Sequence, residues 1–166
     1  MYIDKDNKDN IVLLSIDSSS NRSGWAVFIN GEYVKSGVID LSHIGETDLR
    51  LRRMVGKLQT MIDHYSPAVV VVEETVVLRN PAVQRLLTMI LGAIYGKCAD
   101  AGISYVSLRP TEWRKAVDPS KKPRRRDELK KWSREKVGEI FGVEVPSDDE
   151  SDAILLGLGY INMCNG

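Results

Sequence analysis

The chain has 166 residues, of which 43% are hydrophobic and 28% are charged, and this composition is ordinary for a globular protein. The length fits one domain over residues 1–166, no apolar run approaches the ~20 residues of a membrane helix, and the N-terminus carries no recognisable targeting signal, so we expect a cytoplasmic protein. A formal net charge of zero, taken alone, argues against a nucleic-acid partner.

The first part of the chain predicts three antiparallel strands. Ile11–Asp17 is a short aliphatic run, and Gly24–Asn30 and Glu32–Asp40 follow it. The dipeptide Asn30-Gly31 between the last two runs is typical of a type I′ hairpin, because Asn and Gly both tolerate positive φ.

The rest of the chain predicts alternating helices and strands. A helical period covers residues 46–65, and the continuous apolar run Ala68–Glu73 is typical of a covered central strand. Asn80 and Pro81 predict the start of a helix that ends at Ala101, before Gly102. The remaining predicted elements are a strand over Ile103–Leu108, a helix over Pro110–Val117, a loop over Asp118–Arg126, a helix over Asp127–Phe141 and a helix from Pro146 and Ser147 to Asn162. This order predicts an α/β fold with a five-stranded mixed sheet, three antiparallel strands followed by two parallel ones, and helices on both faces.

Four carboxylates stand at positions that favour a metal site. Asp17 ends the first predicted strand, Glu73 ends the fourth, and Asp149 and Asp152 share one face of the last helix. If the first and fourth strands are neighbours, the four side chains can meet at one end of the sheet. Oxygen ligands without His or Cys indicate Mg²⁺, for which Mn²⁺ can substitute. Two ions about 3.5–4 Å apart could activate a water and stabilise a leaving oxygen of a phosphodiester.

Each acid also has a structural interpretation. A single Asp at a strand end often forms a turn. Ser147 and Glu150 have the spacing of a capping box, in which case Asp148 and Asp149 would only complement the helix dipole. The convergence of several acids favours the metal site, because Asp152 precedes an apolar stretch where an unpaired charge is costly.

At these residues the sequence resembles the RuvC-like Holliday junction resolvases of the RNase H-like superfamily, and more closely their phage-type members. The matching segments are LLSIDSSSNRSGWAVF, VVVEETVVLRN and DESDAILLGLG, with TEWRKAV and a basic helix as a further likeness. The resemblance implies that Asp17, Glu73, Asp149 and Asp152 are catalytic metal ligands. It also implies a homodimer that makes paired symmetric nicks in a four-way DNA junction. Two alternatives stay open, since Glu74 adjoins Glu73 and Asp148 adjoins Asp149.

Charge is concentrated in one region. Between Arg109 and Lys136, twelve Lys and Arg residues face five Asp and Glu residues, an excess of seven positive charges that the rest of the chain balances. Basic side chains there would position DNA through its phosphates. The predicted DNA contacts are Arg22, Arg79, Lys121, Lys122, Arg124, Arg125, Arg126, Lys130, Lys131 and Arg134. Trp113 and Trp132 could stack on an opened base, but packing against the sheet is the favoured interpretation.

The helix over 81–101 is apolar almost all round, with Gly92 and Gly96 allowing close approach. One face could cover the sheet and another a second subunit, or the whole helix could be buried in the core. Three other functions compete with the resolvase: an RNase H-like nuclease for flaps, other branched DNA or RNA–DNA hybrids, an ATP-binding protein of the actin and sugar-kinase fold, and a DNA-binding module without catalysis.

Overall fold

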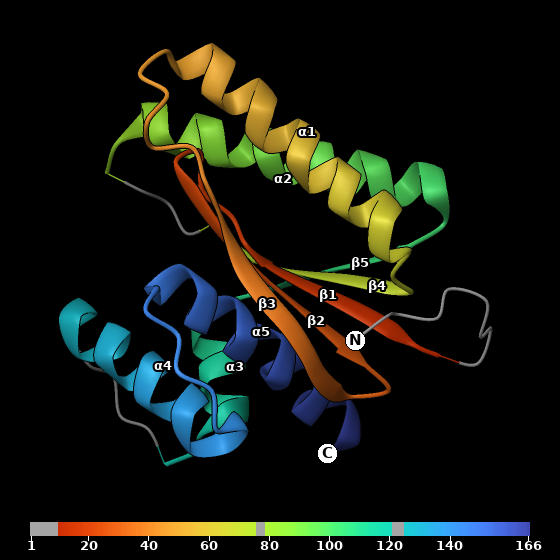
Figure 1. The fold of residues 1–166 in the computed structure, drawn as a ribbon, viewed down its shortest axis with the longest axis vertical. Coiled ribbons are helices and arrows are strands. Elements are labelled where there is room, and N and C mark those ends of the chain that lie inside the picture. Colours follow the sequence, from red (N-terminus) through yellow and green to blue (C-terminus); the bar gives the residue numbers. More distant parts are fainter. Residues whose placement is uncertain (1–9, 76–78, 121–124) are drawn as a thin grey trace.

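The computed structural model describes residues 10–75, 79–120 and 125–166 of the chain. A five-stranded sheet with the order β3-β2-β1-β4-β5 forms its middle layer (Figure 1). The strands are β1 (Val12–Asp17), β2 (Arg22–Ile29), β3 (Glu32–Asp40), β4 (Val69–Glu73) and β5 (Ser104–Leu108). β1 pairs antiparallel with β2 and parallel with β4, so the mixed sheet expected from the sequence is confirmed.

Helices cover both faces of this sheet. They are α1 (Thr47–Tyr65), α2 (Pro81–Ala101), α3 (Pro110–Val117), α4 (Arg126–Phe141) and α5 (Asp148–Asn165). α1 and α2 lie together on one face, and α3, α4 and α5 lie on the other (Figure 1). The α/β class is confirmed, and the bounds differ from expectation mainly at the start of β2 and the end of α5, since element ends are the least sharply determined parts of a sequence pattern.

Local signals set the ends of these elements as the sequence predicts. Asn30 and Gly31 have φ values of 52° and 82°, which a type I′ hairpin between β2 and β3 requires. The Asn80 side chain accepts hydrogen bonds from the amides of Ala82 and Val83 and caps α2. Gly102 ends the helix with a φ of 68°.

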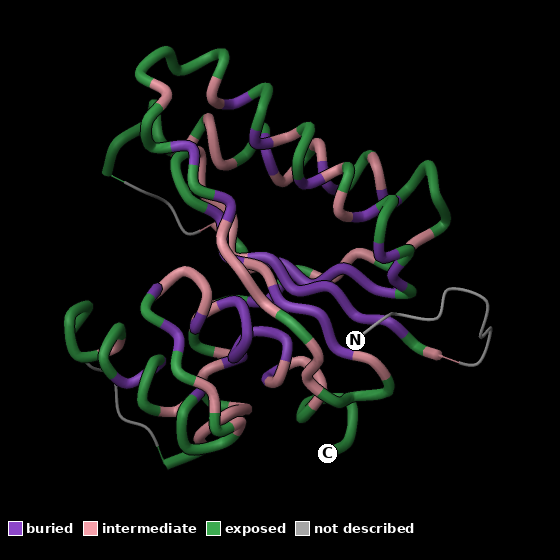
Figure 2. The backbone as a smooth tube through the Cα atoms, viewed as in Figure 1, coloured by how far each residue is buried: buried purple, intermediate pink, exposed green. Residues whose placement is uncertain are grey.

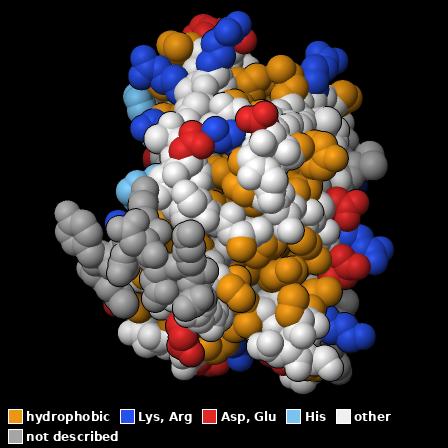
Figure 3. Space-filling model, turned by 90° about the vertical axis from the view of Figure 1, so that its right-hand side faces the viewer, with side chains coloured by type: hydrophobic (Ala, Val, Ile, Leu, Met, Phe, Trp, Pro, Cys, Tyr) orange, Lys and Arg blue, Asp and Glu red, His pale blue; other side chains and the backbone are white. Residues whose placement is uncertain are grey.

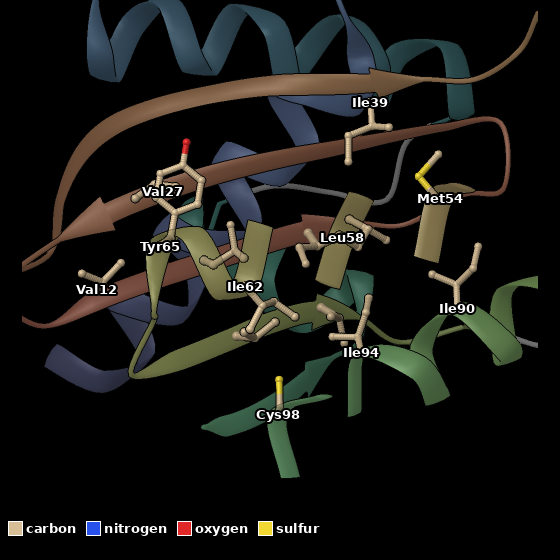
Figure 4. Close-up of a cluster of buried hydrophobic side chains, with 14 of the residues drawn as sticks. Val12, Val27, Ile39, Met54, Leu58, Ile62, Tyr65, Ile90, Ile94 and Cys98 are labelled. Carbon is tan, nitrogen blue, oxygen red and sulfur yellow. The ribbon is translucent and has the colours of Figure 1, made fainter. Parts of the chain in front are cut away.

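The core between the sheet and the first two helices is aliphatic (Figure 4). Met54, Leu58 and Ile62 point from α1 toward the strands, and Ile90 and Ile94 do so from α2. These side chains are almost fully buried, which follows from apolar residues at helical spacing. Burial is densest in the middle strands of the sheet (Figure 2).

On the opposite face, α5 approaches the sheet unusually closely. Ala153, Ile154, Leu155 and Leu156 are buried along it. A Cβ atom at Gly157 would lie only 2.4 Å from the ring of Phe28 on β2, so glycine is needed for this approach. The close packing brings the first turns of α5 to the end of β1.

Some large hydrophobic side chains stay at the surface. On α2 they are Val83, Met89 and Tyr95, whose exposed fractions are 41%, 52% and 58%. Figure 3 shows one side of the molecule, where hydrophobic side chains gather across the middle with charged side chains around them. Among the residues described, no helix has the length and apolar character needed to cross a membrane.

Candidate active site

Two neighbouring strands bring the first pair of acids together. Asp17 is the last residue of β1 and Glu73 is the last residue of β4. The strands are parallel, with Ile16 paired to Val72, so the two acids lie side by side at the carboxyl ends of these strands. From the sequence alone, this adjacency depended on the condition that the first and fourth strands are neighbours.

The start of α5 supplies the second pair. Asp149 and Asp152 lie one turn apart, and a Cβ atom at Gly24 would sit 1.8 Å from the carbonyl oxygen of Asp149. Because Gly24 pairs with Asp17 across β1 and β2, the helix start is packed directly beside the end of β1. The hydroxyl of Ser15 also donates to the carbonyl of Ala153 at 2.7 Å, which ties α5 to β1.

The charges of the other three acids act on Asp17. The pKa of Asp17 is raised well above its usual value, first because burial removes water from the charged form. The negative charges of Glu73, Asp152 and Asp149 raise it further. Asp17 is therefore the centre of the acidic cluster, which we define as Asp17, Glu73, Asp149 and Asp152.

Two hydrogen bonds hold carboxylates of the acidic cluster in place. Trp113 on α3 donates from its indole nitrogen to Oε2 of Glu73 at 2.8 Å, and Ser133 on α4 donates to Oδ1 of Asp152 at 2.5 Å. Burial raises the pKa of Glu73 and raises that of Asp152 to about 6, while these hydrogen bonds act in the opposite direction. Neither donor was identified from the sequence, because nothing in the local pattern shows which acid a distant Trp or Ser will meet.

Arg114 is a third neighbour that sequence reasoning missed. Its guanidinium lies 4.7 Å from the centre of the Trp113 ring. Its positive charge lowers the pKa values of Asp17, Glu73 and Asp152 against the effect of burial. The only available signal was its place directly after Trp113, in a segment read as a short helix.

The adjacent acids Glu73 and Glu74 lie in different surroundings. Glu73 is partly buried and faces the acidic cluster, whereas Glu74 is exposed and its charge acts on Arg109. Successive strand residues face opposite ways, so only one of them can enter the site.

Asp148 and Asp149 also differ in the residues that surround them. Asp148 pairs with Lys130 at 3.0 Å and Arg134 at 2.7 Å, two cations of α4. Asp149 contributes to the raised pKa of Asp17, whereas Asp148 contributes to the raised pKa of Asp152. Asp148 therefore links α4 to α5, and Asp149 belongs to the acidic cluster.

The capping-box interpretation of Ser147 and Glu150 is wrong. Ser147 does stand at the start of α5, but its side chain makes no capping hydrogen bond and instead accepts one from Arg22 at 3.3 Å. Glu150 accepts a hydrogen bond from Ser36 on β3 at 2.6 Å. Tertiary partners thus replace the local ones that the spacing suggested.

The donor set suits a hard divalent cation. Every member of the acidic cluster offers carboxylate oxygens, and a cation would offset the mutual repulsion that raises the pKa of Asp17. Within the described ranges, no three acidic, His or Cys side chains already surround one point closely enough to hold an ion.

The predicted DNA contacts lie in different surroundings. Arg79, Arg125 and Arg126 are exposed, and Lys131 lies 3.6 Å from Glu135. Arg22 lies beside Asp149 at 3.4 Å. Three further predicted contacts, namely Lys121, Lys122 and Arg124, lie outside the described residues. Trp113 and Trp132 are buried, so the packing interpretation of both is confirmed.

A sheet of this order, with acids at the ends of its neighbouring strands β1 and β4 and a helix laid across them, is the RNase H-like arrangement. Solved structures share it. The structure "T. thermophilus RuvC in complex with Holliday junction substrate" superposes with a TM-score of 0.74 at 17% identity, over 93% of this chain and 95% of that one. The yeast mitochondrial Holliday junction resolvase gives 0.61 at 14% identity, over 90% and 77%. These likenesses establish the fold.

Sequence comparisons establish the family. The family described as "Crossover junction endodeoxyribonuclease RuvC" matches residues 13–127, which is more than half of the chain. The proteins of that name from Rickettsia akari and Rhodospirillum rubrum are 28% and 31% identical over 111 and 109 residues. These matches span 64% and 63% of this chain, and 71% and 64% of the relatives. The chain belongs to the RuvC family of crossover junction endodeoxyribonucleases.

Proposed function

We propose that this protein is a Mg²⁺-dependent endonuclease that resolves four-way DNA junctions by paired symmetric nicks. The observation that carries the proposal is the acidic cluster at the ends of β1 and β4, in a chain of the RuvC family. Family membership favours this nuclease over the ATP-binding and the non-catalytic alternatives.

In this proposal the four carboxylates of the acidic cluster hold two divalent ions. Bound ions would supply an activated water and stabilise the leaving 3′-oxygen. Burial and mutual repulsion favour protonation of Asp17 and Asp152 in the absence of cations, and positive charge restores their ionised, ligating form. Mg²⁺ fits because its ligands are hard oxygens, and Mn²⁺ would substitute.

The surrounding residues keep these carboxylates oriented. Trp113 fixes one oxygen of Glu73, and Ser133 fixes one oxygen of Asp152. Ligands held by such neighbours need less reorganisation when an ion arrives. Arg114 brings positive charge to the same place, which stabilises the ionised carboxylates.

DNA would lie across the start of α4. Arg125 and Arg126 are exposed there, and Lys131 follows five residues after Arg126 with 73% of its side chain exposed. Lys130 and Arg134 remain about 45% exposed although both pair with Asp148. Contacts of this kind bind phosphates without reading bases, as recognition of junction shape requires. Binding should therefore weaken steeply with added salt.

A second copy of the chain would pack on α2, which gives the paired sites that symmetric nicking needs. Ile90, Ile94 and Cys98 face the core, while Met89 and Tyr95 are exposed on the other side of the helix. Exposed apolar side chains on one face are typical of a subunit contact. A two-fold dimer would bring the same face of both subunits together.

The test compares a synthetic four-way junction with flap, linear-duplex and RNA–DNA hybrid substrates of matched sequence. We expect Mg²⁺-dependent nicking of the junction above all others. Asp17→Asn and Asp152→Asn should abolish nicking but keep junction binding, because the negative charges lost are at the reaction centre and not on the basic surface. Glu74→Gln is the matched control, since Glu74 is exposed beside the site but outside it, and should nick normally.

Two outcomes would contradict the proposal. Equal cleavage of linear duplex or hybrid would make the protein an RNase H-like nuclease of other specificity. Unchanged nicking by Asp17→Asn would remove the acidic cluster from the chemistry.

A further inference from the structure

One basic side chain stands between two carboxylates at the rim of the acidic cluster. The Nε atom of Arg22 lies 3.4 Å from Oδ2 of Asp149 and 3.7 Å from Oδ2 of Asp40. Its Nη2 atom donates to the hydroxyl of Ser147 at 3.3 Å. The guanidinium is therefore shared between a member of the acidic cluster and an acid outside it.

The sheet dictates this position. Arg22 is the first residue of β2 and pairs across the strands with Asp40, the last residue of β3. Two residues further along β2, Gly24 has no side chain and so allows the start of α5, which carries Asp149, to pack against the strand. Arg22 thus connects the outer edge of the sheet to the helix that completes the site.

The two carboxylates differ in what else binds them. Asp40 is exposed, and Ser42 donates to its Oδ1 from both the hydroxyl and the amide, at 2.5 and 3.0 Å. These hydrogen bonds lower the pKa of Asp40 and leave its Oδ2 toward Arg22. Asp40 is accordingly a stable, charged partner that Arg22 can keep when it leaves Asp149.

We propose that Arg22 competes with the divalent cation for Asp149 and moves to Asp40 when the ion binds. This inference rests on the proposed function, since it takes Asp149 as a ligand. A guanidinium and a cation need the same carboxylate oxygens, and their like charges repel. Arg22 would therefore be a positioning residue that sets the ion affinity of the site.

The size of the effect follows from exposure. The Arg22 side chain is 45% exposed and that of Asp149 is 35% exposed. Ion pairs in such settings are weak, so we expect removal of Arg22 to tighten ion binding by about two- to fivefold rather than by orders of magnitude. Arg22 would tune the site without blocking it.

The experiment measures Mn²⁺ binding to the full chain without DNA, by the electron paramagnetic resonance signal of free Mn²⁺. Arg22→Ala should lower the dissociation constant by about two- to fivefold. Arg52→Ala is the control for loss of one positive charge, because Arg52 on α1 is exposed and forms an ion pair with Asp48, away from the acidic cluster. An Arg22→Ala variant that binds Mn²⁺ no better than the wild type would overturn the proposal.

Asp40 gives an independent test with the opposite sign. In Asp40→Asn the guanidinium loses its second partner and stays on Asp149, so Mn²⁺ binding should weaken. In an Arg22→Ala background the same substitution should have almost no effect. If Asp40→Asn weakens binding equally in both backgrounds, Asp40 acts only as a remote negative charge and the exchange of partners is wrong.

A third variant separates this proposal from the proposed function. Asp149→Asn should weaken Mn²⁺ binding more than any other variant of this series. If it does so while Arg22→Ala changes nothing, only the competition fails. If Asp149→Asn leaves Mn²⁺ binding intact, Asp149 is not a ligand and both proposals fail. Circular dichroism spectra and melting curves of each variant verify that it is folded.

Discussion

Substitution of Gly24 tests whether the close approach of α5 to β2 builds the active site. The Cβ atom of Gly24→Ala would lie 1.8 Å from the carbonyl oxygen of Asp149 and 2.3 Å from its carbonyl carbon, where ordinary contact begins at 3.4 Å. Both atoms belong to the backbone, so no side-chain rotation can relieve the clash. The start of α5 must therefore move by more than an ångström, and Asp149 and Asp152 move with it.

The two expected consequences differ in size. Overpacking of this kind costs about 1–3 kcal/mol, which is less than the total stability of a typical domain, about 5–15 kcal/mol. The variant should therefore fold and melt at a moderately lower temperature. A displacement of about 1 Å at reacting groups lowers rates by about 100-fold, so junction nicking should fall far more than stability.

Gly56→Ala is the matched control. Gly56 lies on the exposed side of α1, and an added Cβ would meet nothing within 4 Å. Alanine in a helix interior is about 0.5–1 kcal/mol more stable than glycine, so this variant should melt slightly higher and nick normally. The assays are thermal unfolding and single-turnover nicking of a labelled junction in Mg²⁺. A Gly24→Ala protein with the wild-type nicking rate would refute the link between this contact and the site.

Three further predictions concern the acids and the proposed subunit contact. Ser133→Ala removes a hydrogen bond that lowers the pKa of Asp152, so the acid limb of the nicking rate should shift to higher pH; an unshifted profile would exclude this role. The pKa of Asp152 rises from 3.8 to about 6 on folding, so the folded chain binds the carboxyl proton of Asp152 more tightly than the unfolded chain does. In EDTA, the free energy of unfolding should therefore fall as the pH rises from about 4 to about 6, which melting curves measure. Asp152→Asn should reduce this fall. Met89→Lys places a charge on the exposed face of α2 and should yield monomers in analytical ultracentrifugation, whereas a persistent dimer would locate the contact elsewhere.

The strands and helices were predictable because their signals are local. Asn30-Gly31 and Asn80-Pro81 specify a turn and a helix start through their own backbone preferences, and the structure uses both. The run Ala68–Glu73 is apolar at successive positions because β4 is covered on both faces. Patterns of this kind depend on one element and its environment, so they can be read without knowing its neighbours.

Residues that contact the acidic cluster were harder to predict. The DNA contact of Arg22 stays a prediction, and the sequence did not indicate that Arg22 lies beside Asp149 and Asp40. Trp113 was interpreted as a core residue, which it is, but its indole nitrogen also holds Glu73. Each of these contacts joins segments far apart in the chain, and sequence periodicity carries no information on which polar atoms meet across such distances.

The same packing explains why the site is both well defined and electrostatically strained. Gly24 and Gly157 let α5 lie against the sheet, and Gly159 lets it lie against Trp113 on α3, with contacts that a Cβ would prevent. This approach buries the apolar face of the helix, which is favourable, but it also brings two further carboxylates to the partly buried Asp17, which is unfavourable and raises its pKa. Hydrophobic packing thus holds together acids that would separate in water. In the proposed function a divalent cation would relieve this repulsion, so the affinity of the site for ions would be in part a consequence of how α5 packs on the sheet.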